Sequence, residues 1–354
     1  METIEKISVQ KTKHSAINEV DWNNLEFGKY HSDHMLVCDY AHEEWQSPKI
    51  IPFTNLSLSP TTLGLHYGQC IFEGLKAFRM IDGRVNIFRP NKHYERFVKS
   101  SERMCMAVIP EWVFMDGLRQ LIEVDQDWVP RQPGSALYIR PFMIATEARL
   151  GVKVSEEFRF MIISGPVGPY YQNPVSVKIE TEFVRAPKGG TGYAKCAGNY
   201  GAAFYPTQKA KEQGYDQVLW TDGRENKYIE ESGTMNVMFV IDGVLVTPPL
   251  SDSILDGVTR DSFIRIAEDA GLKVEERLVS VEEIKNAFID KKLTEAFGAG
   301  TAAVASPIKT IGINGVNYHL PVNKQDSVAE KLKSTLENIR TGKIDDIYNW
   351  NYII

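Results

Sequence analysis

Two short apolar runs early in the chain, residues 75–80 and 84–88, flank the pair Asp82-Gly83. Aspartate followed by glycine favours the backbone angles of a two-residue hairpin turn, so the two runs are predicted to be paired strands. A helix is predicted to follow from about residue 91 to residue 104. The chain is therefore expected to begin as an α+β fold.

A second helix is predicted to begin at Pro110, because proline suits the first position of a helix. Apolar residues recur there at helical spacing and are expected to face the core: Trp112, Met115, Leu118 and Ile122. Strand-like runs come next at residues 136–138 and 158–163.

A cluster of chain breakers follows these strands, Gly165-Pro-Val-Gly-Pro169 and then Asn173-Pro174. Glycine and proline at this density are typical of a connection between folded parts. We expect three regions: an N-terminal α+β domain over residues 1–164, a linker over 165–176 and a larger C-terminal domain over 177–354.

The second half opens with a predicted strand at residues 175–183 and carries the clearest hairpin pattern, 235–241 and 244–247 around Asp242-Gly243. A helix is predicted after Gly257-Val-Thr-Arg260, ending at Gly271.

Another helix is predicted to begin at Ser280, with Glu283 three residues later in the relation of a capping box. The last helix is expected to bury Leu332, Leu336 and Ile339.

Composition narrows the possible functions of this chain. Its 354 residues are 43% apolar and 24% charged, with a net charge of −6, which suits two ordinary domains and argues against a nucleic-acid partner. The N-terminus lacks a signal-peptide pattern, and no stretch approaches the ~20 apolar residues that span a bilayer. A cytoplasmic protein without a membrane association is expected. Its four scattered cysteines are expected to be reduced thiols.

The most informative stretch is Thr191-Gly-Tyr-Ala-Lys-Cys-Ala-Gly-Asn199, which places Lys195 among small and apolar residues. Loss of hydration favours the neutral amine, which can attack a carbonyl. The chemistry this indicates is an imine, most often with pyridoxal phosphate. On local sequence alone, a lysine in a solvent-facing loop is the more frequent alternative.

Pyridoxal phosphate needs partners besides the lysine: an acid facing its pyridine nitrogen, a phosphate cradle and a donor near its phenolic oxygen. Tyr200 lies five residues after Lys195 and is a candidate for the phenolic oxygen. Glu231 is preferred to Glu230 as the acid, because it stands three residues before Thr234 in the pattern Glu-x-Gly-Thr-x-Asn.

Two glycine-containing stretches are candidates for the phosphate cradle. Gly257-Val-Thr-Arg260 is expected at a helix start, where backbone amides are free, and Gly298-Ala-Gly-Thr-Ala302 offers a further amide nest. The second stretch also fits a dinucleotide fingerprint, but Pro307 leaves no room for the required helix. His31 and His34 have no third ligand nearby in sequence, so no metal is expected.

Taken in order, several blocks make the chain resemble the branched-chain amino acid aminotransferases, pyridoxal-phosphate enzymes of fold type IV, over nearly its whole length. The blocks are Tyr67-Gly-Gln-Cys-Ile-Phe-Glu-Gly-Leu-Lys-Ala-Phe78, Tyr138-Ile-Arg-Pro141, Gly192-Tyr-Ala-Lys-Cys-Ala-Gly-Asn-Tyr-Gly201, Glu231-Ser-Gly-Thr-Met-Asn236, Gly257-Val-Thr-Arg260 and Phe297-Gly-Ala-Gly-Thr-Ala302. The resemblance implies a mixed α+β fold of two domains, like that of D-amino acid aminotransferase, with the active site between the domains.

The resemblance also implies roles for single residues. Lys195 would be the covalent anchor of the cofactor and the base that shuttles the proton. The expected cofactor-binding set is Lys195, Arg96, Tyr200, Glu231, Thr234, Val258, Thr259 and Thr301. The expected substrate-binding set is Tyr67, Phe72, Tyr138, Arg140, Tyr170, Thr301 and Ala302, with Arg140 and the tyrosine hydroxyls receiving the second carboxylate of glutamate.

The implied reaction is transamination of leucine, isoleucine and valine with 2-oxoglutarate by a homodimer or a dimer-based higher oligomer. A D-amino acid aminotransferase, an aminodeoxychorismate lyase and a non-catalytic binding protein are the alternatives. A redox Cys-x-x-Cys of some animal relatives is replaced by Ala303 and Ser306. The preferred branched-chain substrate and a biosynthetic or degradative role are left open.

Overall fold

The computed structural model describes residues 7–168, 173–321 and 326–354, and these fold into two compact units. The first unit contains the chain up to residue 168, the short segment Ala194–Ala197 and the C-terminal Ile339–Ile354. The second contains residues 173–193 and 198–338. The segment that carries Lys195 therefore packs with the first unit, although its neighbours in sequence belong to the second.

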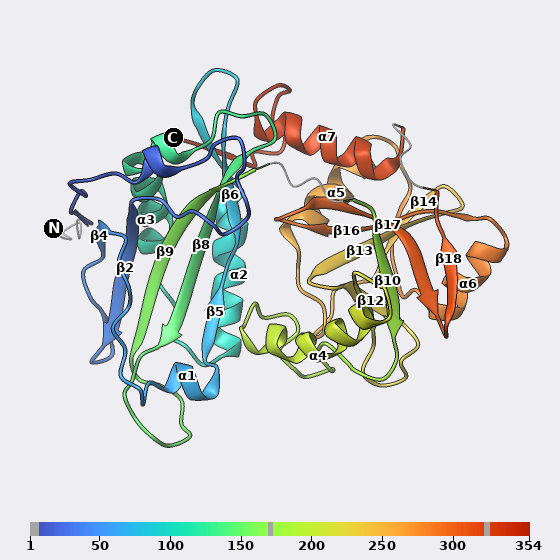
Figure 1. Cartoon of the computed structure of the whole chain (residues 1–354), viewed down its shortest axis with the longest axis horizontal. Coiled ribbons are helices and arrows are strands. Elements are labelled where there is room, and N and C mark those ends of the chain that lie inside the picture. The colour runs from blue at the N-terminus through green and yellow to red at the C-terminus, as the bar shows by residue number, and fades with distance from the viewer. Residues whose placement is uncertain (1–6, 169–172, 322–325) are drawn as a thin grey trace. The chain divides into compact units, whose positions relative to one another are not determined.

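A mostly antiparallel sheet of ten strands forms the first unit within the described residues (Figure 1). Its order is β1 (Ser8–Val9), β4 (Lys49–Pro52), β2 (His34–Ala41), β9 (Phe158–Val167), β8 (Ala136–Ala145), β6 (Leu75–Arg79), β7 (Val85–Phe88) and β19 (Asn351–Ile353). In addition, β3 (Glu44–Trp45) pairs with β2 and β5 (Cys70–Phe72) pairs with β8. The first unit also holds the helices α1 (Leu63–Tyr67), α2 (Pro90–Arg103) and α3 (Glu111–Val124) and the 3₁₀ turns Ile17–Glu19 and Gln126–Trp128.

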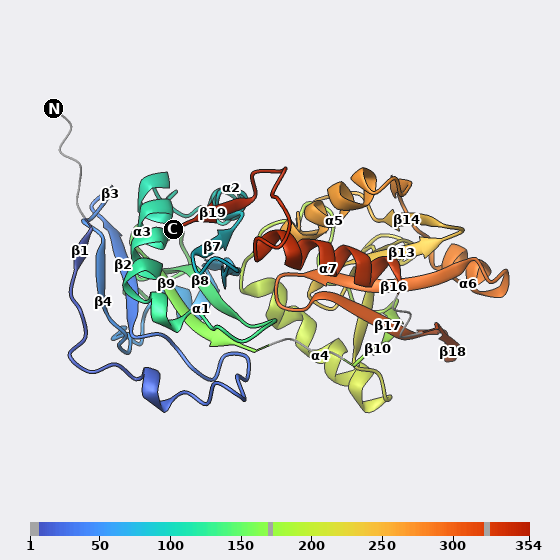
Figure 2. The same ribbon diagram turned by 90° about the horizontal axis from the view of Figure 1, so that it is seen from above.

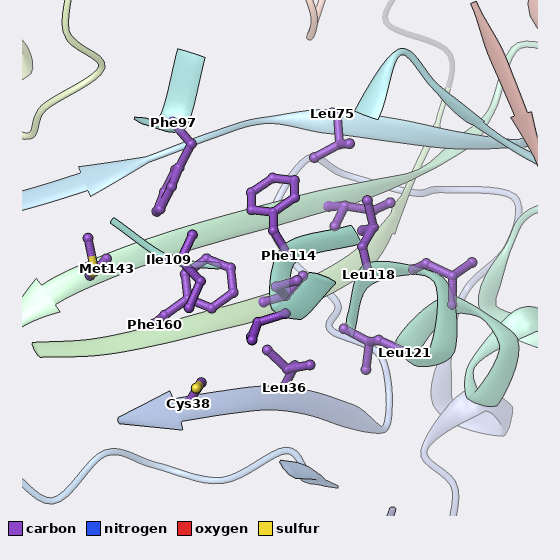
Figure 3. Close-up of a cluster of buried hydrophobic side chains, with 14 of the residues drawn as sticks. Leu36, Cys38, Leu75, Phe97, Ile109, Phe114, Leu118, Leu121, Met143 and Phe160 are labelled. Carbon is purple, nitrogen blue, oxygen red and sulfur yellow. The ribbon is translucent and has the colours of Figure 1, made fainter. Parts of the chain in front are cut away.

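Helices α2 and α3 pack on one face of this sheet (Figure 2). Phe97 of α2 and Phe114 of α3 meet Phe160 of β9, with ring centroids 5.4 and 5.9 Å from it, in the core drawn in Figure 3. Aromatic pairs of this kind contribute about 0.5–1.5 kcal/mol each beyond the area they bury. Both helices predicted in this region are confirmed.

The predicted core-packing face of α3 is confirmed. Leu118 and Ile122 are buried, and Trp112 and Met115 are half-buried and pack against the same core. Val113 and Phe114 are buried as well, so the apolar stripe of α3 is broader than the sequence indicated.

Nine strands form the sheet of the second unit within the described residues. Their order is β12 (Ile229–Ser232), β11 (Gln217–Thr221), β10 (Val175–Glu180), β17 (Val304–Ile313), β16 (Leu293–Gly300), β13 (Met235–Ile241), β14 (Val244–Thr247) and β15 (Val274–Glu276), with β18 (Val316–His319) paired to β17. The helices are α4 (Gly198–Glu212), α5 (Val258–Asp269), α6 (Val281–Ile289) and α7 (Val328–Arg340).

Side-chain alternation along β11 places successive residues in two different cores. Val218 and Trp220 pack with Ala203 and Ala210 of α4, whereas Leu219 belongs to a second core cluster. Successive residues of a strand point to opposite faces, so this second cluster lies on the side of β11 away from α4. A strand buried on both faces in this way has no polar alternation to reveal it in the sequence.

Both predicted hairpins are confirmed, as β6–β7 and β13–β14. Two strands are longer than predicted, because β8 extends to Ala145 and β9 to Val167, while β10 ends at Glu180, before the predicted residue 183. Gly165 and Pro166 thus pair with β8 inside the sheet. The domain boundaries 1–164, 165–176 and 177–354 stay a prediction. In the described part of the chain, no helix combines the length and apolar character needed to cross a membrane.

The N-terminus of α6 has the predicted cap. The backbone N–H of Glu283 donates to Ser280 Oγ at 3.0 Å. The Glu283 carboxylate receives two hydrogen bonds from Arg277, at 2.7 and 3.0 Å.

Replacing Ser280 with alanine is expected to destabilise the protein by about 1 kcal/mol, because one backbone N–H of α6 loses its acceptor. Urea unfolding of the wild type and the variant measures the difference. Ser334→Ala, which removes an exposed hydroxyl in α7, is the matched control. Equal midpoints for Ser280→Ala and the wild type would show that the cap does not stabilise the fold.

Candidate active site

The backbone of Lys195 is fixed against the first unit's sheet. Its carbonyl accepts a hydrogen bond from the N–H of Phe72 at 3.0 Å, and its neighbour Cys196 forms an antiparallel bridge with Ile71 of β5. The N–H of Lys195 donates to Ser100 Oγ at 2.9 Å, and the Ser100 hydroxyl donates to the carbonyl of Arg96. Lys195 is thus tied through α2 to the arginine predicted to bind phosphate.

Two predicted site residues, Lys195 and Arg140, lie against the aromatic ring of a third, Phe72. Lys195 Nζ lies 4.8 Å from the centroid of the Phe72 ring, and the guanidinium carbon of Arg140 lies 4.6 Å from the same centroid. Arg140 Nη2 donates to the hydroxyl of Tyr138 at 2.8 Å. Lys195 is half-buried there. An amine and an anion-binding guanidinium therefore share a wall of aromatic carbon.

The missing side chain of Gly74 leaves room for the Tyr138 hydroxyl. A Cβ atom on Gly74 would lie 2.2 Å from that oxygen, far inside van der Waals contact. Any other residue at position 74 would displace Tyr138, and with it the partner of Arg140.

Arg96 is buried in a cluster that the sequence did not predict. Its Nε and Nη2 donate to the two carboxylate oxygens of Glu73, at 2.6 and 2.7 Å, and His93 Nδ1 lies 2.6 Å from Glu73 Oε2. Burial alone would raise the pKa of Glu73, but Arg96 and His93 together hold it well below its usual range. Burial lowers the pKa of His93, so its neutral ring donates Nδ1–H to the carboxylate.

Two other residues of the predicted substrate set, Tyr67 and Tyr170, are not part of this described group. Tyr67 ends α1, is 43% exposed, and packs beside His66 with ring centroids 6.1 Å apart. Tyr170 lies outside the described residues. The structure therefore does not place Tyr67 or Tyr170 with the Phe72 ring.

In the second unit, Glu231 is buried in β12 and held on both oxygens. Oε1 accepts from the N–H of Leu255 at 2.9 Å and from Asn236 Nδ2 at 3.2 Å, and Arg185 Nε lies 2.9 Å from Oε2. A buried carboxylate is costly unless it is paired with a cation and hydrogen-bonded, and Glu231 has both kinds of contact. Thr234, in the turn between β12 and β13, is exposed.

The first turn of α4 carries Tyr200, which is half-buried. Just before it, Asn199 is linked to Thr191 by two hydrogen bonds, at 2.7 and 2.8 Å. These bonds fix the residues that flank the Lys195 segment on the second unit.

The start of α5 has the features of an anion site. Gly257 is its N-cap, and Val258 and Thr259, both buried, follow. A Cβ on Gly257 would lie 1.9 Å from Asn236 Oδ1, so glycine is required for this approach. The Arg260 side chain does not add to this anion site, because its Nη2 donates to Glu276 at 2.5 Å and to the carbonyl of Pro248 at 2.8 Å. Backbone amides and the helix dipole remain as the binding elements.

Thr301 and Ala302 are half-buried in the turn between β16 and β17. No helix follows Gly298 and Gly300, which confirms the rejection of a dinucleotide fingerprint. Those glycines instead lie against Met235, which a Cβ would meet at 2.7 and 3.0 Å.

The histidines considered as metal ligands have other partners. His34 Nδ1 lies 2.6 Å from Asp125 Oδ1, and the His31 ring stacks on Phe53 with centroids 3.7 Å apart. Within the described ranges, no group of three or more His, Cys, Asp or Glu side chains is placed to hold a metal.

Comparison with known proteins decides the family. The family described as amino-transferase class IV matches residues 71–311. The chain is 47% identical to branched-chain-amino-acid transaminase 1 of Bacillus subtilis, covering 93% of this chain and 94% of that protein. A probable branched-chain-amino-acid aminotransferase of Staphylococcus epidermidis is 45% identical over 98% of both chains. The chain belongs to the branched-chain aminotransferases of class IV.

Solved structures of branched-chain aminotransferases share the fold. The enzyme from Thermoproteus uzoniensis superposes with a TM-score of 0.74 at 24% identity, covering 90% of this chain and 99% of that one. The Escherichia coli enzyme gives 0.71 at 23% identity, covering 90% and 98%. The predicted fold class, fold type IV, is confirmed.

Several residues that shape this aminotransferase site were missed from the sequence. Glu73 lies inside the quoted block 67–78 but carried no assigned role, and His93 stands one helical turn before Arg96. Arg185 had no recognisable signal, because its partner Glu231 lies 46 positions further along the chain. Only the fold brings such residues together.

These residues fit pyridoxal phosphate, the cofactor of class IV aminotransferases. The fit rests on an amine beside an aromatic wall at Lys195, a buried ionised carboxylate at Glu231, and a helix start where Gly257 leaves no space for a Cβ. Each provides one of the groups that the cofactor requires.

Proposed function

We propose that the protein transfers the amino group of L-leucine, L-isoleucine and L-valine to 2-oxoglutarate, giving branched-chain 2-oxo acids and L-glutamate. It is a transferase that uses pyridoxal phosphate. The proposal rests on one observation: Lys195 and Arg140 both lie against the ring of Phe72. An apolar wall beside an anion-binding group suits both a hydrocarbon side chain and glutamate.

Lys195 has two roles in the proposal. Its Nζ is the attachment point of the cofactor, and the same nitrogen carries the proton from the substrate α-carbon to the cofactor's C4′. When bound, pyridoxal phosphate supplies an electron sink for the carbanion at the α-carbon. Glu231, held as an anion, keeps a proton on the ring nitrogen, and the Tyr200 hydroxyl binds the phenolic oxygen.

The phosphate is assigned to Arg96 and to backbone amides. Arg96 is held at Nε and Nη2 by Glu73, which orients the guanidinium. Val258 and Thr259 begin α5 and would bind the phosphate through their backbone amides. Thr301, which follows β16, and Thr234 are assigned to cofactor binding as well. Such amides stabilise a phosphate dianion without a lysine.

The substrate is assigned to aromatic and small residues. Phe72 and Tyr138, together with Tyr67 and Tyr170, would form the walls for the branched side chain. Arg140 would bind the second carboxylate of glutamate, and the turn at Thr301 and Ala302 would receive the α-carboxylate. Burying a carboxylate needs such a cation, since an unpaired buried charge costs far more free energy than an unpaired neutral polar group.

The assembly and location are further parts of the proposal. A homodimer or a dimer-based higher oligomer is proposed from the family resemblance, and a cytoplasmic location is proposed with it.

A donor panel tests the proposed substrate class. With 2-oxoglutarate as acceptor, L-leucine, L-isoleucine and L-valine are expected to react at rates within about 10–200-fold of one another, because one methylene changes the barrier little. L-glutamate forms at the same rate as the 2-oxo acid. Activity confined to D-alanine or to aminodeoxychorismate would contradict the proposal and favour the other class IV activities.

A further inference from the structure

Arg185 forms a buried ion pair with Glu231. Its Nε lies 2.9 Å from Glu231 Oε2, with the two side chains 9% and 3% exposed. Its Nη2 donates to the carbonyl of Gly192 at 3.1 Å and to the carbonyl of Ser253. Two backbone carbonyls therefore fix the guanidinium through Nη2, and they leave its Nε in ion-pair contact with the Glu231 carboxylate.

The other oxygen of Glu231 is fixed by the loop before α5. Leu255 donates its N–H to Oε1, and Asn236 donates to Oε1 and to the carbonyl of Leu255, the latter at 2.9 Å. Asn236 is also the residue that Gly257 approaches. Neutral donors orient this oxygen, whereas Arg185 brings a full positive charge to the other one.

Glu230, the neighbouring carboxylate, shows what burial does without such a contact. Its Oε1 accepts from Ser253 Oγ, and its Oε2 is buried without a partner among the described residues. Burial raises the pKa of Glu230; Arg185 lowers it, while Glu231 and Asp222 raise it further. Two adjacent carboxylates thus differ in their environments, since Glu231 is paired with a guanidinium and Glu230 accepts from a hydroxyl.

We propose that Arg185 is a positioning residue for transamination, which keeps Glu231 ionised and aimed at the ring nitrogen of pyridoxal phosphate. The inference rests on the proposed function, since it assigns Glu231 to that nitrogen. A carboxylate that took up a proton would no longer hold a proton on the ring nitrogen, and the ring would be a weaker electron sink.

The test uses the holoenzyme of three variants, Arg185→Met, Glu231→Gln and the double variant, with Arg277→Met as the control. Arg277 pairs with Glu283 elsewhere in the same unit. The first readout needs no substrate: the visible absorption band of the resting enzyme is titrated with pH. When the pyridine ring of the cofactor loses its positive charge, the nitrogen that joins Lys195 to the cofactor becomes more basic. The midpoint of the band's pH titration is therefore expected to rise by about one pH unit or more in Arg185→Met.

Two further results are expected if Arg185 acts through Glu231. Glu231→Gln shifts the midpoint in the same direction, and the double variant shifts it no further than the larger single shift. The kcat/KM for L-leucine falls about 10²-fold in Arg185→Met, and the acidic limb of its pH profile moves to higher pH, because Glu231 then takes up a proton more readily. Arg277→Met leaves the band and the profile unchanged.

An unchanged midpoint in Arg185→Met, or shifts that add in the double variant, would overturn the inference while leaving the proposed function intact. A wild-type protein without a visible band would instead contradict the proposed function itself. Should Arg185→Met fail to fold, Arg185→Gln, which keeps a polar side chain without the charge, carries the same expectations.

Discussion

Lys195→Ala is expected to lose transamination and the visible absorption band together. Lys195 provides both the covalent attachment and the proton-transferring base, and base catalysis alone contributes about 10²–10⁴-fold. We expect kcat for L-leucine with 2-oxoglutarate to fall about 10⁴-fold or more, since the nucleophile is lost as well. Stopped assays of glutamate formation and an absorption spectrum of the purified variant measure both effects.

Lys209→Ala is the matched control for this loss. Lys209 also stacks on an aromatic ring, with Nζ 5.6 Å from the Tyr205 centroid, but it lies on α4 and is exposed. Its removal should leave the spectrum and the turnover unchanged. A Lys195→Ala enzyme with normal turnover would remove the lysine from the mechanism.

Glu73→Gln is expected to destabilise the protein by about 3–5 kcal/mol at neutral pH, because the buried guanidinium of Arg96 then loses the charge of the Glu73 carboxylate. The pKa of Glu73 is depressed in the folded protein, so its contribution is present above the ordinary carboxyl value of 4.5 and is lost progressively below it. The difference between wild type and variant should therefore shrink as the pH falls below 4.5. Urea unfolding at pH 7 and in the acid range measures it.

Glu147→Gln provides the comparison for this prediction. Glu147 pairs with Lys153 at 3.0 Å near the surface, and exposed pairs contribute only about 0–1 kcal/mol. A stability difference for Glu73→Gln that is equally small, or that stays constant as the pH falls, would show that the Glu73–Arg96 pair is not the source of the effect.

Elements specified by local sequence were predicted well. The Asp-Gly pairs at residues 82–83 and 242–243 set their hairpins, and Ser280 caps α6, because turn and cap geometry depend on adjacent residues. The amphipathic face of α7 was predicted correctly too, since Leu332, Leu336 and Ile339 are all buried.

Arrangements between distant segments were not predictable in the same way. The Lys195 segment pairs with β5, and the C-terminal strand β19 completes the sheet beside β7. Neither pairing has a local signal, because strand partners are chosen by the packing of the whole unit. The sequence pattern likewise marked neither end of the Glu73–Arg96 contact as buried.

The residues of the candidate site also differ in whether a local motif marks them in the sequence. Lys195 and Glu231 were proposed from their motifs, and their roles stay predictions. The structure places Lys195 and Arg140 against the ring of Phe72. Arg185 was missed because an arginine in a loop has no distinctive spacing. The individual roles assigned to Tyr200, Thr234 and Thr301 stay predictions.

The most direct measurement is to locate the cofactor on the chain. The purified holoenzyme is reduced with borohydride, digested and mapped by mass spectrometry. The account predicts a single phosphopyridoxyl adduct on the peptide that contains Lys195. An adduct on a different lysine, or none at all, would contradict it.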